Sequence, residues 1–187
     1  MILGMIMYFS AAWMYCGKML RFGTAPSPAT WLPWAVMAII NALSFQVMRG
    51  DAISTIGVWS AVLLNDGVFL FALVKGKFSK MQPLDYILLA IVLISIVTWK
   101  AAGSASYANL VLQVGIFISI VPTWIKAWHK PSSEPAIPWL IWGMSYVPAL
   151  IVMIIDWKGW PSLVLPINAM TIQLIVAGIV LARSKVR

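Results

Sequence analysis

The sequence predicts an all-α polytopic membrane protein, with seven transmembrane helices forming two parallel three-helix bundles joined by a linker helix. Three observations predict this fold: the composition, seven apolar runs of membrane-spanning length, and an internal repeat. Of the 187 residues, 62% are hydrophobic and only 10% are charged, whereas soluble domains contain about 25% charged residues. A soluble fold of this size cannot hide so much apolar surface, so the chain is expected to reside in a bilayer.

Seven runs have the length and composition of a membrane helix, which needs about 20 apolar residues. In chain order they cover residues 2–20, 29–48, 53–75, 83–99, 106–127, 136–155 and 161–182. The sequence Asn-Asp-Gly at 65–67 interrupts the third run, which is nevertheless too short to form two spans. The polar breaks between runs leave no room for a soluble domain.

The 13 basic residues divide unequally between the two sides of the membrane. Ten lie after spans one, three and five or in the tail: Lys18, Arg21, Lys75, Lys77, Lys80, Lys126, Lys130, Arg183, Lys185 and Arg187. Three lie on the other side: Arg49, Lys100 and Lys158. The positive-inside rule then predicts the N-terminus outside and the C-terminus in the cytoplasm. The net charge of +8 is expected at helix ends facing lipid headgroups, and no nucleic-acid partner is predicted.

An internal repeat appears when the chain is compared with itself at a shift of 105 residues. "PSPATWLPW" at 26–34 falls on "PSSEPAIPW" at 131–139, pairing Pro26 with Pro131, Ser27 with Ser132, Pro33 with Pro138 and Trp34 with Trp139. The fourth span has no counterpart. The predicted division is a first three-helix repeat over 1–75, a linker helix over 76–104, and a second repeat with a short cytoplasmic tail over 105–187.

An odd linking span gives the two repeats the same orientation in the membrane. Parallel repeats are related by an axis along the membrane normal, and transporters built this way bind their solute at the repeat interface near the midplane. The sequence therefore predicts a site between the two bundles.

The stretch 121–139 resembles a cytoplasmic hairpin of the SWEET and PQ-loop superfamily of small seven-helix transporters. The resemblance rests on a pattern of proline, aromatic, basic and Ser-Ser-Glu positions: Pro122, Thr123, Trp124, Lys126, Trp128, Lys130, Ser132, Ser133, Glu134, Pro138 and Trp139. It implies a three-one-three architecture with an outside N-terminus, and transport of a small polar solute, of which a sugar is the leading class.

The resemblance also implies site residues. Family members carry an asparagine on the third helix of each repeat, which here corresponds to Asn65 and Asn168. They also carry an asparagine followed four residues later by an aromatic residue near the end of the second helix, which corresponds to Asn41 and Phe45. The second repeat has Leu150 at the aromatic position, a departure from the pattern of the sugar carriers.

The residues themselves support the same candidates. An amide at membrane depth costs several kcal/mol if unpaired, so Asn65 and Asn168 either hydrogen-bond a neighbouring helix or bind a solute. Asp66 is the one acid deep in a span, and intramembrane carboxylates are functional candidates. Its alternatives are proton coupling, pairing with a basic residue, or capping a kink at Gly67.

Three tryptophans lie deep in spans rather than near span ends, where the indole ring prefers the headgroup region. They are Trp13, Trp59 and Trp142, which are candidates for lining a cavity, with packing as the alternative. Trp59 and Trp142 are also predicted to bind the substrate. We predict that Pro33, Pro122 and Pro138 act as hinges, because proline removes a backbone hydrogen bond and helices bend at such points.

Lys126, His129, Lys130 and Glu134 are expected to form a solvated rim. With one cysteine and one histidine in the chain, no metal site is predicted, and no cofactor. The chain lacks paired deep carboxylates and a nucleophile–base arrangement, so it is not expected to be an enzyme. The alternative to a transporter is a receptor or scaffold of the same fold. The predicted partners are a small solute and the bilayer, a homo-oligomer stays open, and the predicted location is the plasma (cytoplasmic) membrane.

Overall fold

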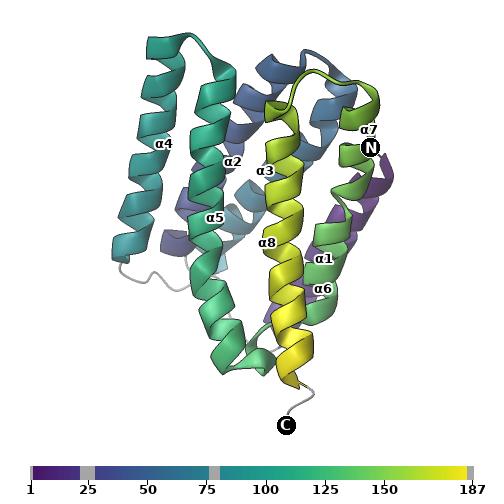
Figure 1. Ribbon diagram of the computed structural model, residues 1–187. Coiled ribbons are helices and arrows are strands. Elements are labelled where there is room, and N and C mark those ends of the chain that lie inside the picture. The colour runs from purple at the N-terminus through teal and green to yellow at the C-terminus, as the bar shows by residue number, and fades with distance from the viewer. Residues whose placement is uncertain (1, 22–27, 76–80, 185–187) are drawn as a thin grey trace.

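The computed structural model describes residues 2–21, 28–75 and 81–184, and all regular structure in this part of the chain is helical (Figure 1). The elements are α1 (Ile2–Arg21), α2 (Pro28–Arg49), α3 (Ala52–Lys75), α4 (Pro83–Ala102), α5 (Ala105–His129), η1 (Pro131–Ser133), α6 (Ala136–Met144), α7 (Val147–Ile155) and α8 (Pro161–Ser184). Several residues used above lie outside the described residues: Pro26, Ser27, Lys77, Lys80, Lys185 and Arg187.

The predicted all-helical class is confirmed, and each of the seven apolar runs is helical. Five stretches are long and apolar enough to cross a membrane: 31–49, 83–102, 105–129, 136–155 and 161–184. Two shorter apolar stretches, Ile2–Gly17 and Thr55–Phe71, lie in α1 and α3. The chain is therefore built as a membrane protein, and the count of seven crossings stays a prediction.

The sixth run differs from the prediction, because it is not one continuous helix. α6 ends at Met144 and α7 begins at Val147, with a turn at Ser145 and Tyr146 between them. Pro148 explains the break: it has no N–H to donate to the carbonyl of Met144, and its ring crowds that carbonyl. The turn is held locally, since the Ser145 hydroxyl donates to the Trp142 carbonyl at 2.6 Å.

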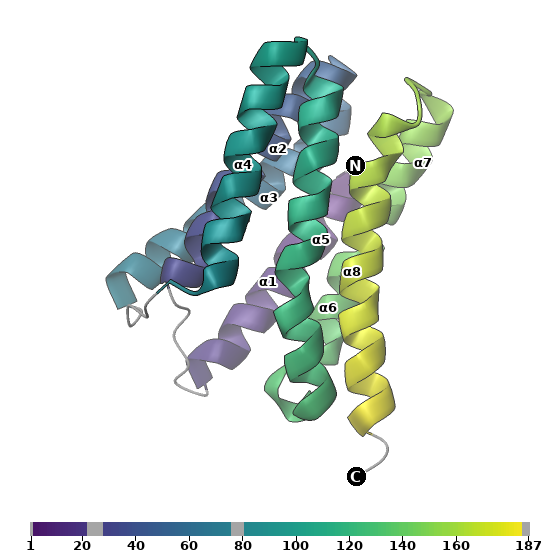
Figure 2. The same cartoon turned by 60° about the vertical axis from the view of Figure 1, so that its left-hand side comes forward.

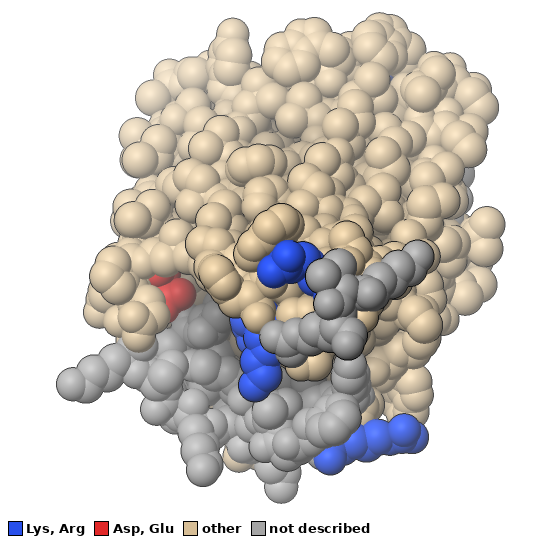
Figure 3. Space-filling model, turned by 60° about the horizontal axis from the view of Figure 1, so that its bottom comes forward, with Lys and Arg blue, Asp and Glu red and all other residues tan. Residues whose placement is uncertain are grey.

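The outer surface is apolar, as a bilayer requires. Large hydrophobic side chains such as Leu63, Val74 and Ile155 are exposed along the helices. Trp13, one of the deep tryptophans, is 83% exposed and so faces the surroundings rather than a cavity. Figure 3 shows an uncharged flank above the end of the molecule where the basic side chains gather.

The helices alternate in direction, with the N-terminus in the upper half of the molecule and the C-terminus at the lower end (Figures 1 and 2). α3 packs against α1 and α2, and α8 packs against α5, α6 and α7. Across the middle, α1 contacts α6 while α2 contacts α5. α4 lies at the edge of the molecule, against α5 and α2 (Figure 1).

Gly4 of α1 lies against the backbone of the turn between α6 and α7. A Cβ atom placed on Gly4 would lie 2.5 Å from the backbone oxygen of Ser145, which is too close for any side chain. A glycine here lets the first helix approach the interrupted helix of the second half closely.

We expect Gly4→Ala to lower the free energy of unfolding by about 1–3 kcal/mol, because overpacking against a backbone oxygen forces the helices apart. Gly17→Ala is the matched control, since a Cβ at Gly17 meets nothing within 4 Å, and alanine there is expected to stabilise α1 slightly. Melting temperatures of the two variants in detergent give the comparison. Equal melting temperatures would show that the Gly4 contact is not tight in the folded protein.

Candidate functional site

A cavity of about 340 Å³ lies between the two halves of the chain. Its walls come from α1, α2 and α3 on one side and from α5, α6 and α8 on the other, with Glu134 and Tyr146 from the adjoining connections. The described residues of α4 contribute nothing to the lining. The volume is at the lower end of the range for small-molecule sites, about 300–1,000 Å³.

Aromatic rings dominate one wall of the cavity. The rings of Tyr15, Trp139 and Trp142 pack against one another with centroids 5.3–5.9 Å apart. The indole N–H of Trp142 donates to the backbone oxygen of Tyr8 at 3.0 Å, and the Tyr8 and Tyr146 rings meet edge to face. Trp31 and Trp34 of α2 also line the space. A ligand here would meet flat apolar faces more often than polar atoms.

The expectation that Glu134 lies on a solvated rim is wrong. Its side chain is only 5% exposed, and its carboxylate receives three donors. The Lys126 ammonium lies 3.0 Å from Oε1, while Oε2 accepts from the Trp139 indole at 3.1 Å and from the Tyr15 hydroxyl at 3.5 Å. The carboxylate is held inside because α1, α5 and α6 each supply one of these donors. His129 and Lys130 are exposed as expected.

A network of buried amides joins α2 to α5 and α8. Asn41 Oδ1 accepts from Asn109 Nδ2 at 2.8 Å and from Gln113 Nε2 at 3.0 Å. Asn109 Nδ2 also donates to Ser44 Oγ at 3.0 Å. Asn168 Nδ2 donates to the backbone oxygen and to Oε1 of Gln113, at 2.9 and 3.1 Å. Each amide of this network is thus hydrogen-bonded to a neighbouring helix.

Charged residues at the end of α2 and just after α7 meet at the upper end of the structure. The Arg49 side chain is fully buried, and its guanidinium donates to Asp156 Oδ2 at 2.7 Å and to the Asp156 carbonyl at 3.0 Å. The Lys158 ammonium donates to the Arg49 carbonyl at 2.7 Å and lies 3.8 Å from Asp51. We call Arg49, Asp51, Asp156 and Lys158 the outer cluster.

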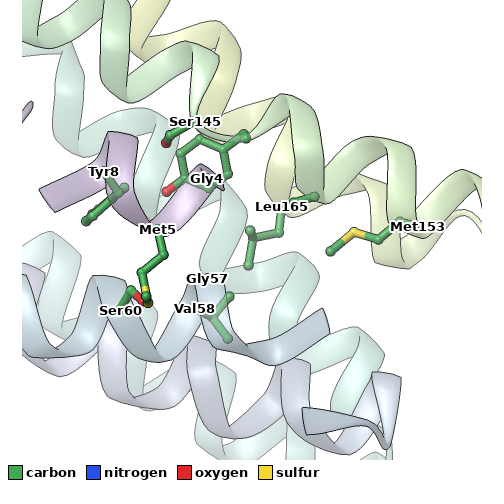
Figure 4. Close-up of a pocket in the computed structure, with 11 residues that line it drawn as sticks. Gly4, Met5, Tyr8, Gly57, Val58, Ser60, Ser145, Met153 and Leu165 are labelled. Carbon is green, nitrogen blue, oxygen red and sulfur yellow. The ribbon is translucent and has the colours of Figure 1, made fainter. Parts of the chain in front are cut away.

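A smaller void of about 30 Å³ borders the same cavity and is shown in Figure 4. Residues of α1, α3, α7 and α8 surround it, together with Ser145. It shares Tyr8, Val58, Tyr146 and Leu165 with the cavity. Its volume holds about one water molecule, so the space narrows sharply in this direction.

Three of the predicted substrate-binding residues line the cavity: Asn41, Asn65 and Trp142. Asn65 Nδ2 donates to the Ala61 carbonyl of its own helix at 2.8 Å. Asn168 does not line the cavity, and its side chain donates a hydrogen bond to Gln113, which does. Of the two predicted asparagines, Asn65 thus lines the cavity, while Asn168 contacts it only through Gln113.

Phe45, Trp59 and Asp66 are not part of the cavity lining. Phe45 is fully buried in an apolar cluster with Val58, Val62 and Met153. Trp59 faces an outer groove, where its indole donates to Gln46 at 2.8 Å. Asp66 is half-buried on α3.

The predicted hinge prolines occupy different helical positions. Pro33 and Pro122 lie inside α2 and α5, and Pro122 also lines the cavity. Pro138 is the third residue of α6, where its missing N–H removes no intrahelical hydrogen bond. A hinge role for these residues stays a prediction.

Sequence reasoning missed most residues of the site, among them Tyr8, Tyr15, Gln113, Tyr146 and Gln173. Gln113 carried a usable signal, because it lies four residues after Asn109 in an apolar run and the two amides share one helix face. The tyrosines carried none, since a tyrosine in an apolar run is an ordinary packing residue.

Among the described residues, no group of three or more His, Cys, Asp or Glu side chains lies close enough to hold a metal ion. Comparison of the chain with protein-family models, with curated proteins and with solved structures finds no match. The site must therefore be interpreted from its own geometry.

Proposed function

We propose that this chain is a membrane transporter that moves a small polar solute by alternating access between two three-helix units. The main support for this proposal is the cavity, because its lining residues come from both predicted units and none of the described residues of α4 contributes to it. The contacts support two equivalent units, because α1·α3 matches α5·α8 and α1·α6 matches α2·α5 under the 105-residue shift.

The two ends of the cavity differ, which supports a conformation that is accessible from one side of the membrane only. At the lower end Pro122, Thr123 and Lys126 line it, near the ends of α1, α5 and α8. Toward the upper end the space narrows to the small void, and the outer cluster joins α2 to α7. This is the arrangement expected of a carrier that is closed toward one side and accessible from the other.

The charge distribution supports the orientation. Arg21, Lys126, Lys130 and Arg183 lie at the lower end, where Figure 3 shows blue side chains. We therefore propose that this end faces the cytoplasm, with the N-terminus outside, and that the protein resides in the plasma (cytoplasmic) membrane.

Uptake into proteoliposomes, measured with a panel of sugars, amino acids and vitamins, tests the transporter proposal. Asn65→Ala, which removes an amide from the cavity wall, and Asn168→Ala, which removes the support of Gln113, are each expected to lower the initial rate about tenfold. Tyr86→Phe on α4 is the control and should leave the rate unchanged. A protein that binds a compound from the panel but never carries it inward would be a receptor or scaffold instead.

Proton coupling through Asp66 is tested in the same vesicles. Uptake that follows an imposed pH gradient in the parent protein, and that loses this dependence in Asp66→Asn, would indicate coupling. Equal uptake at all gradients would indicate facilitated diffusion.

A further inference from the structure

An arginine is held in a fixed position where α5 and α8 end. The two helices pack side by side (Figures 1 and 2). Near their lower ends the Arg183 guanidinium lies over the Trp128 indole, 4.6 Å from the ring centroid. Its Nε also donates to the Trp128 carbonyl at 3.4 Å. The ring contact and the hydrogen bond together fix the plane of the guanidinium, which is otherwise free to turn on a long side chain.

No carboxylate of the chain neutralises this guanidinium. The structure describes all five acidic residues. Two of them belong to the outer cluster, and Glu134 is held by Lys126. None of the five forms an ion pair with Arg183. Because Trp128 engages only Nε, both terminal NH₂ groups of Arg183 remain without a hydrogen bond to the described residues.

The surroundings of Arg183 are those of the headgroup region of a bilayer. Indole rings prefer that region, and Trp128 is 51% exposed. On the same two helices, Ile125 and Leu181 expose apolar side chains closer to the middle of the membrane. Lys130 adds an exposed positive charge just beyond the end of α5. The planar fork of a guanidinium matches the oxygens of a phosphate group, and basic sites between helix ends bind anionic headgroups.

We infer that Arg183 and Trp128 form a binding site for the phosphate group of an anionic phospholipid, whose acyl chains lie along the exposed apolar side chains of α5 and α8. The phosphate oxygens accept from the terminal NH₂ groups, and the lipid supplies the negative charge that the chain does not. The apolar side chains beside Arg183 favour a lipid over a soluble phosphate. The inference does not depend on transport, because Arg183 lies outside the cavity lining.

Native mass spectrometry of the full chain in detergent, titrated with phosphatidylglycerol or phosphatidylcholine, tests the inference. We expect the first phosphatidylglycerol to bind at least fivefold more tightly than phosphatidylcholine, whose choline cation cancels the phosphate charge. Arg183→Gln is expected to weaken phosphatidylglycerol binding about tenfold. Arg21→Gln is the matched control, since Arg21 is an exposed arginine at the same end with no ring contact among the described residues. It is expected to change the binding less than about twofold.

Two substitutions that keep the number of charges at Arg183 distinguish a built site from general attraction to a basic surface. Arg183→Lys retains the charge but loses the planar fork, and is expected to weaken phosphatidylglycerol binding about fivefold. Trp128→Leu removes the ring beneath the guanidinium, and is expected to weaken it about threefold. General attraction predicts no change in either variant. Melting temperatures without added lipid show that each variant is folded.

Glycerol 3-phosphate separates a lipid site from a site for free phosphate. In large molar excess it is expected to leave phosphatidylglycerol bound, because it has no acyl chains. Displacement of the lipid by glycerol 3-phosphate would overturn the inference. Equal binding of the two lipids, equal effects of Arg183→Gln and Arg21→Gln, or unchanged binding in both Arg183→Lys and Trp128→Leu would overturn it as well.

Discussion

Arg49→Gln is expected to open the upper side of the molecule. The Arg49 guanidinium is fully buried and makes two hydrogen bonds to Asp156, at 2.7 and 3.0 Å. Breaking a buried ion pair costs about 3–5 kcal/mol when both partners are buried. Asp156 is 53% exposed, which reduces the expected loss to about 2 kcal/mol. If the pair is present only in the closed state, about 2 kcal/mol moves the equilibrium roughly 30-fold toward opening.

The opening can be measured by chemical labelling. Ala149 lines the small void, so Ala149→Cys in a Cys16→Ser background reports access from outside to a membrane-impermeant maleimide. Adding Arg49→Gln is expected to raise the labelling rate at least tenfold. Arg183→Gln, at the opposite end, should have no effect. A labelling rate that stays at the parent value in Arg49→Gln would show that the outer cluster does not close the cavity.

Asn109→Leu is expected to lower the free energy of unfolding by about 2 kcal/mol. Asn109 is fully buried and takes part in three hydrogen bonds, to Asn41, Ser44 and Gln113. Side-chain hydrogen bonds between membrane helices contribute about 0.6 kcal/mol each on average. Leucine keeps the number and branching of the side-chain heavy atoms, so the substitution leaves no cavity, and its larger methyl groups add a packing cost to the loss of the bonds.

Ser119→Ala is the control for this experiment. Ser119 is also a buried polar residue of α5, but its hydroxyl donates to the Ile116 carbonyl of its own helix at 2.7 Å. Its removal is expected to change stability by less than about 0.5 kcal/mol. Unfolding in a mixed-detergent titration gives both values. If the two variants lose the same stability, the amide network does not join the halves.

The backbone of this chain could largely be predicted from its sequence, because hydrophobic runs bounded by turns and charges determine where membrane helices begin and end. The predicted run 83–99 corresponds to α4 at Pro83–Ala102, and 106–127 corresponds to α5 at Ala105–His129. The break at Ser145 was missed, although Pro148 marks it, because the apolar pattern continues without interruption through the turn.

The side-chain partners could not be predicted in the same way. Polarity inside an apolar run drew attention to Asn65 and Asn168, but which helix faces them depends on packing that one sequence does not encode locally. Glu134 is the clearest case. Its neighbours in sequence are those of a loop, and its burial depends on Tyr15, which lies 119 residues away.

The interruption between α6 and α7 makes the two halves unequal, since α2, the counterpart of this pair, runs unbroken from Pro28 to Arg49. α7 is a rod of nine residues, with the acidic partner of Arg49 immediately after it. Because the helix is interrupted at Ser145 and Tyr146, a change in the angle between α6 and α7 breaks few backbone hydrogen bonds. When the two units rock against each other, we therefore expect a local bend at this turn in the second unit that the first unit lacks.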